Sequence, residues 1–238
     1  MEAASAPRPP LTSQLDHLVV LAASLAQGVR WCERVLGVTP GTGGEHALMG
    51  THNRLLSVAS PAYPLAYLEL IAINSEANYG RASWTRRWFD LDEPEIQLQL
   101  EKSGPQLAHF VARTGRAEAG KRALARLGLD RGEVLQASRM TPQGLLQWKI
   151  TVRDDGERLL FGTLPTLIEW GEVHPAQAMA PSGVELLSLE ARHPRPDVLR
   201  AAYEAIGLTG LALAQGAPNL VATLQTPRGL VTLESKGL

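Results

Sequence analysis

The feature that most constrains this chain is a pattern that occurs three times along it. Each occurrence begins with a strand-like run, at Leu15, Leu107 and Val184, and continues into a helix-like stretch that ends at a glycine in VLGV, RLGL or AIGL. The distance from strand to glycine is roughly 20 residues each time, which is typical of repeated supersecondary units. Further strand-like runs follow each helix. One helix for several strands predicts an α+β protein with mixed sheets and not a doubly wound parallel sheet.

Local signals support the predicted helices and divide the chain. Ser24 and Gln27 fit a capping box at the start of the first helix. Gly37, Gly128 and Gly207 stand where a helix needs a left-handed residue to end. The predicted organisation is a loose tail at 1–13, two paired units within 14–178 (about 14–77 and 104–178) and a third, smaller unit at 179–238. The stretch 78–102 is predicted to be a partly helical covering connection, and GTGGEHALMGTHN, from Gly41, a turn-rich loop.

Composition excludes several classes of protein. The chain has 238 residues, 45% of them hydrophobic, which is enough to bury a sizeable core. A net charge of −1 predicts no broad attraction to nucleic acid or to anionic lipid. No apolar run is long enough to cross a membrane, and the N-terminus lacks the order of a signal peptide. The single cysteine, Cys32, indicates a reducing compartment, so a cytoplasmic location is expected.

Two histidines and two glutamates occupy matching places in the first two units. His17 and His109 lie in the first strands, and Glu69 and Glu169 lie in the last strands. If the units pair about a pseudo-twofold axis, the four side chains converge. Two neutral imidazoles and two carboxylates form a reasonable site for a divalent cation.

Strand alternation gives these residues apolar neighbours. Side chains two residues apart share a face, so His17 is expected beside Leu15 and Val19, and Glu69 beside Tyr67 and Ile71. The same reasoning places Glu169 beside Leu167. A carboxylate on an apolar face costs several kcal/mol unless a metal or a hydrogen-bond partner compensates it. Glu69 and Glu169 are therefore candidates for chemistry as well as for metal binding.

Other polar residues are candidates for the walls of the same pocket. His46, His52 and Asn53 fall in or near the glycine-rich loop of the first unit, where they can line the pocket mouth. Trp170 and His174 closely follow Glu169 and can reach the same pocket. A solvated loop and core packing are the competing explanations for these residues. The chain has no phosphate-binding loop, serine elbow or H-E-x-x-H helix.

Taken together, LDHLVV with His17, WCERVLGV, YLELIAI with Glu69 and TLIEWGEVHP resemble the glyoxalase-like branch of the vicinal oxygen chelate superfamily. The resemblance covers almost the whole chain after the first dozen residues. It implies paired βαβββ modules that form a cupped mixed sheet around the active site, with a third related module at the C-terminus as a departure from the usual plan. It also implies metal ligands at His17, Glu69, His109 and Glu169.

Three functions are compatible with these observations. The preferred hypothesis is a metal-dependent enzyme (a lyase, isomerase or related enzyme) that acts on a small oxygenated metabolite, with Zn, Ni, Fe or Mn as Lewis acid. Glu169 is the preferred general base and Glu69 the second choice. The alternatives are a metal-free protein that binds or sequesters a small molecule, and an extradiol-type dioxygenase. The expected partners are a small-molecule substrate or ligand and a second copy in a homodimer.

Overall fold

The computed structural model describes residues 9–142 and 144–238. Its N-terminal half begins with a strand, a helix and three further strands: β1 (Ser13–Leu21), α1 (Leu25–Val35), β2 (Gly41–His46), β3 (Thr51–Ser57) and β4 (Tyr67–Ile73). A long connection then leads into α2 (Pro94–Ser103). Of the predicted tail, residues 1–8 lie outside the described residues, and Ser13 already belongs to β1, where its N–H donates to Gly207 O at 3.0 Å.

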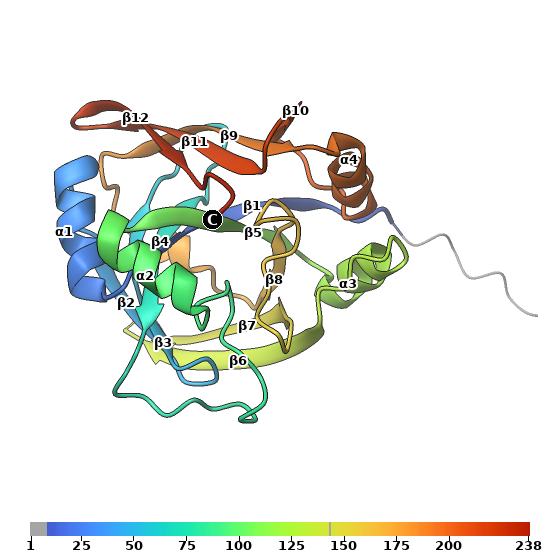
Figure 1. Cartoon of the computed structure of the whole chain (residues 1–238), viewed down its shortest axis with the longest axis horizontal. Helices are drawn as coiled ribbons and strands as arrows, with labels where there is room; N and C mark the ends of the chain where they lie inside the picture. Colours follow the sequence, from blue (N-terminus) through green and yellow to red (C-terminus); the bar gives the residue numbers. More distant parts are fainter. Residues whose placement is uncertain (1–8, 143) are drawn as a thin grey trace, which may run out of the picture.

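The rest of the chain repeats this order of elements. The next five are β5 (Gln106–Thr114), α3 (Ala117–Ala125), β6 (Glu133–Thr141), β7 (Gly144–Val152) and β8 (Thr166–Trp170). A short 3₁₀ helix, η1 (Pro175–Ala178), precedes β9 (Glu185–His193), α4 (Pro196–Ala205), β10 (Ala212–Gln215), β11 (Asn219–Thr226) and β12 (Gly229–Glu234). The predicted α+β class is confirmed, and Figure 1 shows the strands enclosed by helices at the periphery.

The strands form two sheets. The larger is a curled eight-stranded mixed sheet in the order β2-β3-β4-β1-β5-β8-β7-β6, and the smaller has the order β10-β9-β11-β12. In each half of the larger sheet the first strand pairs in parallel with the last, β1 with β4 and β5 with β8. The two halves meet where β1 and β5 run antiparallel.

The third segment differs from the first two in its strand pairing. Its first strand, β9, pairs in parallel with β10 and antiparallel with β11, whereas β12 pairs with β11. The element order agrees with the predicted third unit, but the pairing of first strand with last strand is missing. That the three segments are related modules stays a prediction.

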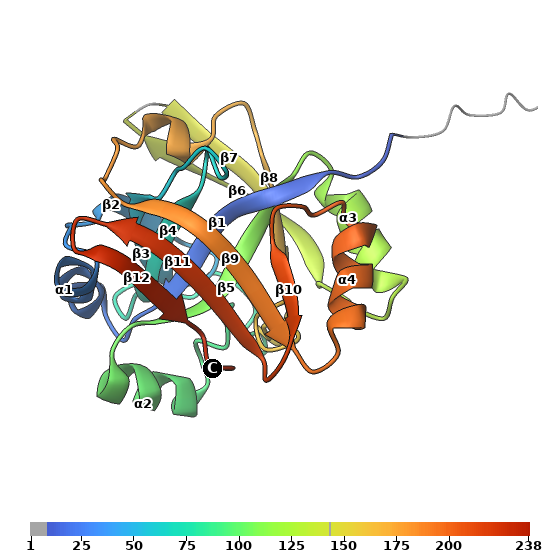
Figure 2. The same ribbon diagram turned by 90° about the horizontal axis from the view of Figure 1, so that it is seen from above.

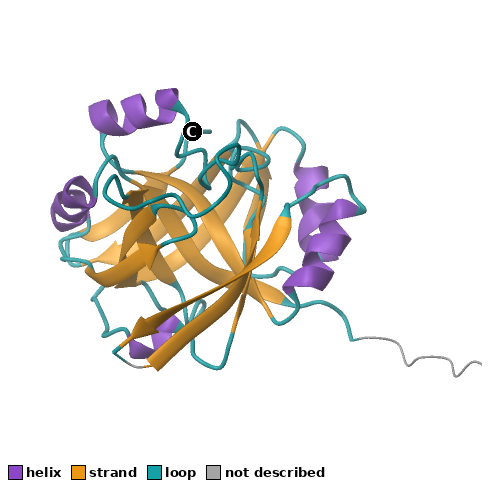
Figure 3. Cartoon of the chain, turned by 90° about the horizontal axis from the view of Figure 1, so that it is seen from below, coloured by secondary structure: helices purple, strands orange, loops and turns teal. Residues whose placement is uncertain are grey.

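The smaller sheet packs against the outer face of the larger one. Figure 2 shows β9, β11 and β12 lying over β1 and β5, and Figure 3 shows the helices around the outside of the strands. The core between the sheets includes Leu18 and Phe110 from the large sheet and Leu189, Tyr203 and Leu220 from the third segment. This packing leaves the concave face of the large sheet free to enclose its own apolar cluster and a cavity.

Two elements correct the sequence-based expectations. The run from Gly41, expected to be a turn-rich loop, begins with the edge strand β2, which pairs with β3. The other edge strand, β6, was not expected. The predicted glycine stops are confirmed, because Gly37, Gly128 and Gly207 all have left-handed φ angles (78°, 75° and 63°). None of the helices in the described residues is both long and apolar enough to cross a membrane.

Candidate functional site

The concave face of the large sheet holds a small cavity that we call the inner cavity. It has a volume of about 40 Å³, and its walls come from both halves of the sheet. The first half contributes polar groups, namely His17, His46, Asn53 and Glu69, together with Tyr67. The second half contributes mainly aromatic and aliphatic groups, together with one cation: Arg139, Leu146, Trp148, Ile150, Ile168 and Trp170.

A β-bulge in β1 positions His17. The register between β1 and β5 shifts between Leu15 and His17, so Leu15 packs in the outer core while His17 lines the inner cavity. The expected shared face of His17 with Leu15 is therefore wrong, because the extra residue of a bulge reverses the alternation. The bulged residue is Asp16, and its Oδ1 accepts a hydrogen bond from His17 Nδ1 at 2.6 Å.

Glu69 lies on the neighbouring strand β4, two residues after Tyr67, which is the register partner of His17. Its Oε2 is 3.5 Å from His17 Nε2, and both residues are almost completely buried. Its other oxygen, Oε1, accepts a hydrogen bond from Asn53 Nδ2 at 2.6 Å. The expected alternation holds in this strand, since Tyr67 lines the cavity and Ile71 packs in the inner apolar cluster.

The electrostatics of this pair are strongly coupled. Burial opposes the charge on Glu69, but the hydrogen bond and charge of His17, with help from His46 and Asn53, lower the pKa of Glu69 to about 2. Burial likewise opposes the charge on His17, but Asp16 and Glu69 raise the pKa of His17 to about 9. At neutral pH the site therefore holds the His17 imidazolium between two carboxylates, those of Asp16 and Glu69.

His46, expected at the pocket mouth, lies beside this pair. Its Nε2 is 3.8 Å from Glu69 Oε1 and 3.2 Å from Asn53 Nδ2, and its Nδ1 is 3.0 Å from Thr51 Oγ1. Burial lowers the pKa of His46 to about 4 in spite of the nearby Glu69 charge, so this imidazole is neutral. Of the other two residues expected there, Asn53 lines the inner cavity, whereas His52 is absent from the described walls of the cavities.

The structure does not bring His109 to this group. The Thr166 backbone N–H donates to His109 Nε2 at 3.1 Å, which leaves the proton on Nδ1, and Nδ1 donates to Gly162 O at 3.0 Å. Both ring nitrogens are thus occupied in holding the β7–β8 connection against β5. Burial, together with the charges of Arg131 and Arg158, holds the pKa of His109 well below its usual range. The expected role of His109 as a metal ligand is not supported.

The structure also directs Glu169 away from the cavity. Its Oε2 accepts the backbone N–H of Ala117, the first residue of α3, at 2.8 Å, and its Oε1 pairs with Lys149 Nζ at 2.9 Å. Glu169 shares a face with Leu167 as expected, but Leu167 belongs to the outer core, so this face is the convex one. Its neighbours Ile168 and Trp170 take the concave side. Of the four predicted ligands, the structure brings two, His17 and Glu69, to the inner cavity.

Trp170 and His174 reach the site, and they do so through Asp16. Trp170 Nε1 donates to Asp16 Oδ2 at 2.9 Å, and His174 Nε2 lies 2.9 Å from the same oxygen. Burial opposes the charge on Asp16, but the hydrogen bonds from His17 and His174 lower the pKa of Asp16 far below its usual value. The second half of the sheet thus fixes the carboxylate that orients His17. Sequence reasoning did not select Asp16, although it directly precedes His17.

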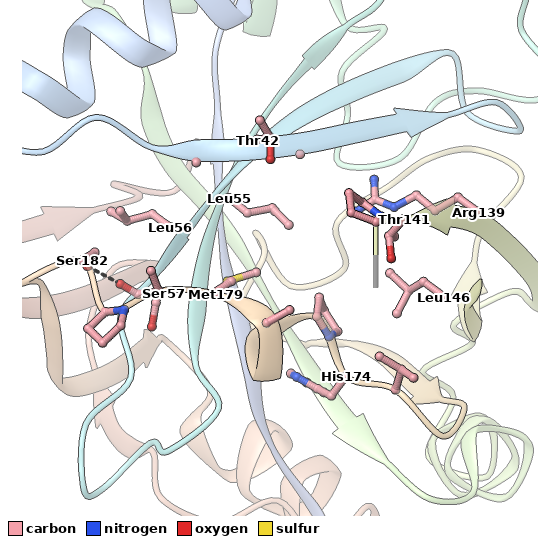
Figure 4. Close-up of a pocket in the computed structure, with 18 of the residues that line it drawn as sticks. Thr42, Leu55, Leu56, Ser57, Arg139, Thr141, Leu146, His174, Met179 and Ser182 are labelled. Carbon is pink, nitrogen blue, oxygen red and sulfur yellow. Dashed lines mark hydrogen bonds between the residues drawn. The ribbon is translucent and has the colours of Figure 1, made fainter. Parts of the chain in front are cut away.

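Two larger cavities adjoin the inner one. The polar outer cavity, about 370 Å³, is lined by hydroxyl groups such as Thr42, Ser57 and Ser182, with His174 and Met179 (Figure 4). The apolar outer cavity, about 580 Å³, is lined largely by side chains such as Met49, Leu135 and Trp148. Arg139, from β6, lines all three cavities. No sequence pattern distinguished Arg139, because its place depends on how the two sheet edges approach each other.

The donor groups around Glu69 do not fit a divalent metal. Gly44 N donates to Asn53 Oδ1 at 2.8 Å, which fixes the orientation of the Asn53 amide. The amide NH₂ then lies between Glu69 Oε1 and His46 Nε2, where a cation bound by both would need to sit. Among the residues that the structure describes, no group of three or more His, Cys, Asp or Glu side chains could hold a metal ion.

The sequence profile of the glyoxalase-like domain matches residues 15–207, which span both halves of the large sheet, β9 and α4. The chain belongs to the glyoxalase-like domain family. The resemblance seen in the sequence is thus confirmed at the level of the family. No curated protein sequence matches the chain.

Solved structures resemble this glyoxalase-like protein in fold. A hypothetical protein from Staphylococcus aureus has 14% identity and a TM-score of 0.53, covering 93% of this chain and 85% of its own. Methylmalonyl-CoA epimerase from Mycobacterium tuberculosis has 17% identity and a TM-score of 0.39, covering 74% and 98%. A Streptomyces coelicolor methylmalonyl-CoA epimerase variant in complex with 2-nitronate-propionyl-CoA has 15% identity and a TM-score of 0.38, covering 67% and 96%. The match with a TM-score of 0.53 is a likeness of fold alone at 14% identity.

Proposed function

We propose that this glyoxalase-like protein is an enzyme that moves a proton on a small oxygenated compound, with Glu69 and His17 as its acid–base pair. The observation that carries the proposal is the distance of 3.5 Å between Glu69 Oε2 and His17 Nε2, both at the wall of the inner cavity. A buried, charged pair with strongly displaced pKa values beside a cavity is typical of functional sites. In this proposal Glu69 takes the role that the sequence favoured for Glu169.

The proposed step is the enolisation of a carbonyl compound. Glu69 removes a proton from the carbon next to the carbonyl group, and the C–H bonding pair forms the carbon–carbon double bond. The carbonyl π pair moves to oxygen, which takes the proton from His17 Nε2. Return of a proton to carbon completes an isomerisation or an epimerisation. The step requires no oxidant or reductant, and one proton is gained by Glu69 for each one lost by His17.

The coupling of the two groups favours this exchange. The pKa of Glu69 is low and that of His17 is high because each charge stabilises the other. When His17 gives up its proton, the main reason for the low pKa of Glu69 disappears, so both charges are lost together. The two groups titrate together, so an observed pKa belongs to the pair and not to either residue alone.

The surrounding side chains support the pair in this role. Asp16 holds His17 Nδ1, so that only Nε2 faces the cavity, and the Tyr67 ring stacks on His17 with the ring centres 4.5 Å apart. Trp88 and Trp148 line the same cavity with aromatic surface. The inner cavity is large enough for the reacting end of a molecule, while the outer cavities have room for the remainder.

An exchange assay on a panel of carbonyl compounds tests this proposal. Small 2-oxo acids and 2-hydroxy ketones are incubated with the protein in D₂O, and loss of the signal of the proton next to the carbonyl is followed by NMR. Catalysed exchange by the wild type that Glu69→Gln abolishes supports the proposal. Exchange that survives in Glu69→Gln contradicts it, because no other carboxylate lines the inner cavity in the described part of the chain.

The second candidate function is binding of a small molecule without turnover. The volume of the outer cavities supports it, because they have room for a ligand. A binding protein gives saturable, ligand-dependent stabilisation in a thermal-shift experiment, with no exchange above background. The dioxygenase hypothesis needs two histidines and a carboxylate on iron, and the position of the Asn53 amide does not favour that arrangement.

A further inference from the structure

Arg139 is the most unusual charged residue outside the acid–base pair. Its Nε and Nη1 atoms are buried, and in the described part of the chain neither has a hydrogen-bond partner. Leaving a buried charged donor unpaired costs free energy that a purely structural arginine would recover through a partner. A guanidinium with two unpaired buried nitrogens at the junction of three cavities is therefore placed to bind an anionic ligand.

The backbone is shaped to receive this guanidinium. Arg139 lies on one edge strand of the large sheet, β6, and it reaches Gly44 on the opposite edge strand, β2. A Cβ atom on Gly44 would lie 1.9 Å from Arg139 Nη1, so only glycine leaves room for this approach. The side chain thus bridges the two edges of the curled sheet above the inner cavity.

The polar outer cavity has the chemistry of an anion site. Arg139 is its cation, and none of the described residues that line it is a carboxylate. Thr42 contributes a hydroxyl group to the same walls, whereas the lining hydroxyls of Thr39 and Ser182 already donate to Glu33 Oε1 and to Ser57 O. Figure 4 shows Arg139, Thr42 and His174 on different sides of this space. An arginine fork with a neighbouring hydroxyl group suits the oxygens of a carboxylate or a phosphate.

Two other arginines with unpaired buried nitrogens are less suited to this role, and one of them, Arg81, already pairs with Asp154. Arg131 also has unpartnered Nε and Nη1 atoms, but it faces a cavity of only about 10 Å³. A space of that size holds little more than one water molecule. Arg139, in contrast, faces cavities that share walls with the Glu69 and His17 pair.

We propose that Arg139 binds an anionic group of the substrate, a carboxylate or a phosphate, in the polar outer cavity. The inference deepens the proposed function, on which its catalytic meaning rests: the substrate is a small organic anion whose carbonyl end enters the inner cavity. The two cavities share part of their walls. An anionic group bound in the polar outer cavity would therefore lie next to a reacting carbon in the inner cavity. The shared lining residues are Leu55, Arg139, Leu146 and Pro175.

Calorimetric binding to the whole protein tests the anion site separately from catalysis. The probes are 2-oxobutyrate, its neutral methyl ester and inorganic phosphate at millimolar concentration. We expect Arg139→Gln to weaken binding of the charged probes about tenfold or more, because charged hydrogen bonds are lost, and to leave the ester unchanged. Comparison of 2-oxobutyrate with phosphate shows which anion the site prefers. Arg30→Gln, an exposed arginine on α1, is the matched control.

A second pair of variants keeps the test independent of the arginine itself. Gly44→Ala displaces the guanidinium without removing its charge, and we expect it to weaken anion binding as well. Gly115→Ala is its control, because no atom lies within 4 Å of the added Cβ. A measurement of stability distinguishes an anion-binding role of Arg139 from a structural one. Removal of an unpaired buried charge leaves the melting temperature unchanged or raises it, whereas loss of a structural arginine lowers it.

The outcomes distinguish the two proposals. Anion binding that depends on Arg139, without any exchange by the wild type, retains the anion site and overturns the proposed enzyme. Exchange with equal affinity for acid and ester in wild type and Arg139→Gln retains the enzyme and overturns the anion site. Failure of the wild type to bind any charged probe, or a lower melting temperature for Arg139→Gln with unchanged binding, also overturns the anion site.

Discussion

The two halves of the large sheet carry the same residue types at matching places and use them differently. His17 and His109 both lie on first strands, and Glu69 and Glu169 both lie on last strands. In the first half the two side chains lie 3.5 Å apart in the wall of the inner cavity. In the second half the histidine fastens a loop, and the glutamate accepts the first N–H of a helix.

This difference shows that the place of a residue in a sequence pattern does not determine on which face of the strand its side chain lies. A single-residue offset turns Glu169 to the convex side, because side chains alternate strictly along a strand. Likewise, the bulge at Asp16 turns His17 to the concave side and supplies the carboxylate that holds it. The two halves of the large sheet therefore give the inner cavity one largely polar wall and one largely apolar wall.

Removal of each glutamate in turn tests most strongly whether the two halves of the sheet have different roles. We expect Glu69→Gln to reduce proton exchange on an active substrate by about 10²–10⁴-fold, since general acid–base catalysis typically contributes that factor. Glu169→Gln is expected to leave the exchange rate within a factor of two or three, roughly the effect of a distant surface change. Equal losses in both variants would restore the symmetrical four-residue site.

The second prediction concerns the structural role of His109, which His17 does not share. We expect His109→Ala to lower the free energy of unfolding by about 2–4 kcal/mol, because the backbone groups of Gly162 and Thr166 lose their buried partner and a cavity remains. Urea denaturation measures this change. His52→Ala, a partly exposed control, is expected to change stability by less than about 0.5 kcal/mol. A His109→Ala protein as stable as the wild type would mean that this ring is not a structural clamp.

The same histidines predict opposite dependences of stability on pH. The pKa of His17 is raised to about 9, so its contribution to stability is fully present below pH 6.5 and is lost as pH rises from 6.5 towards 9. The pKa of His109 is lowered, so its contribution is present above pH 6.5 and is lost as pH falls below that value. Melting temperatures from pH 5 to 9 test both signs. His17→Gln should flatten the alkaline decline, and an unchanged decline would contradict this assignment.

The smallest expected effect concerns Glu169 as a helix cap. Glu169→Gln should lower the free energy of unfolding by about 1 kcal/mol, through loss of charge at the α3 N-terminus and of the half-exposed Lys149 pair. Lys149→Gln separates the two contributions, since it removes only the ion pair. A Glu169→Gln protein with higher stability would contradict the capping role.

Sequence alone predicted the parts of the fold that depend on local chemistry. The glycine stops, the strand β4 and the partly helical connection that contains α2 follow from backbone freedom and from runs of apolar residues. The glycine-rich edge strand β2 was missed, because its glycines signal turns when considered without the partner strand β3.

The site was predicted only in part, for similar reasons. Glu69 and His17 were selected because charged groups within apolar strands need compensation, and the structure brings them together. Asp16 was passed over because strict alternation places it on the opposite face, and a bulge leaves no clear mark in the residues. Arg139 depends on two sheet edges that are far apart in sequence, so no local pattern reveals it.

The most direct test of the account is an NMR measurement of the histidine ring nitrogens in ¹⁵N-labelled protein at pH 7. We expect His17 to carry protons on both ring nitrogens, and His109 to carry one, on Nδ1. Removal of Glu69 by Glu69→Gln should lower the pKa of His17 and leave the His109 signals unchanged. A neutral His17 at pH 7, or two histidines that titrate alike, would contradict the claim that the two halves of the sheet have taken different roles.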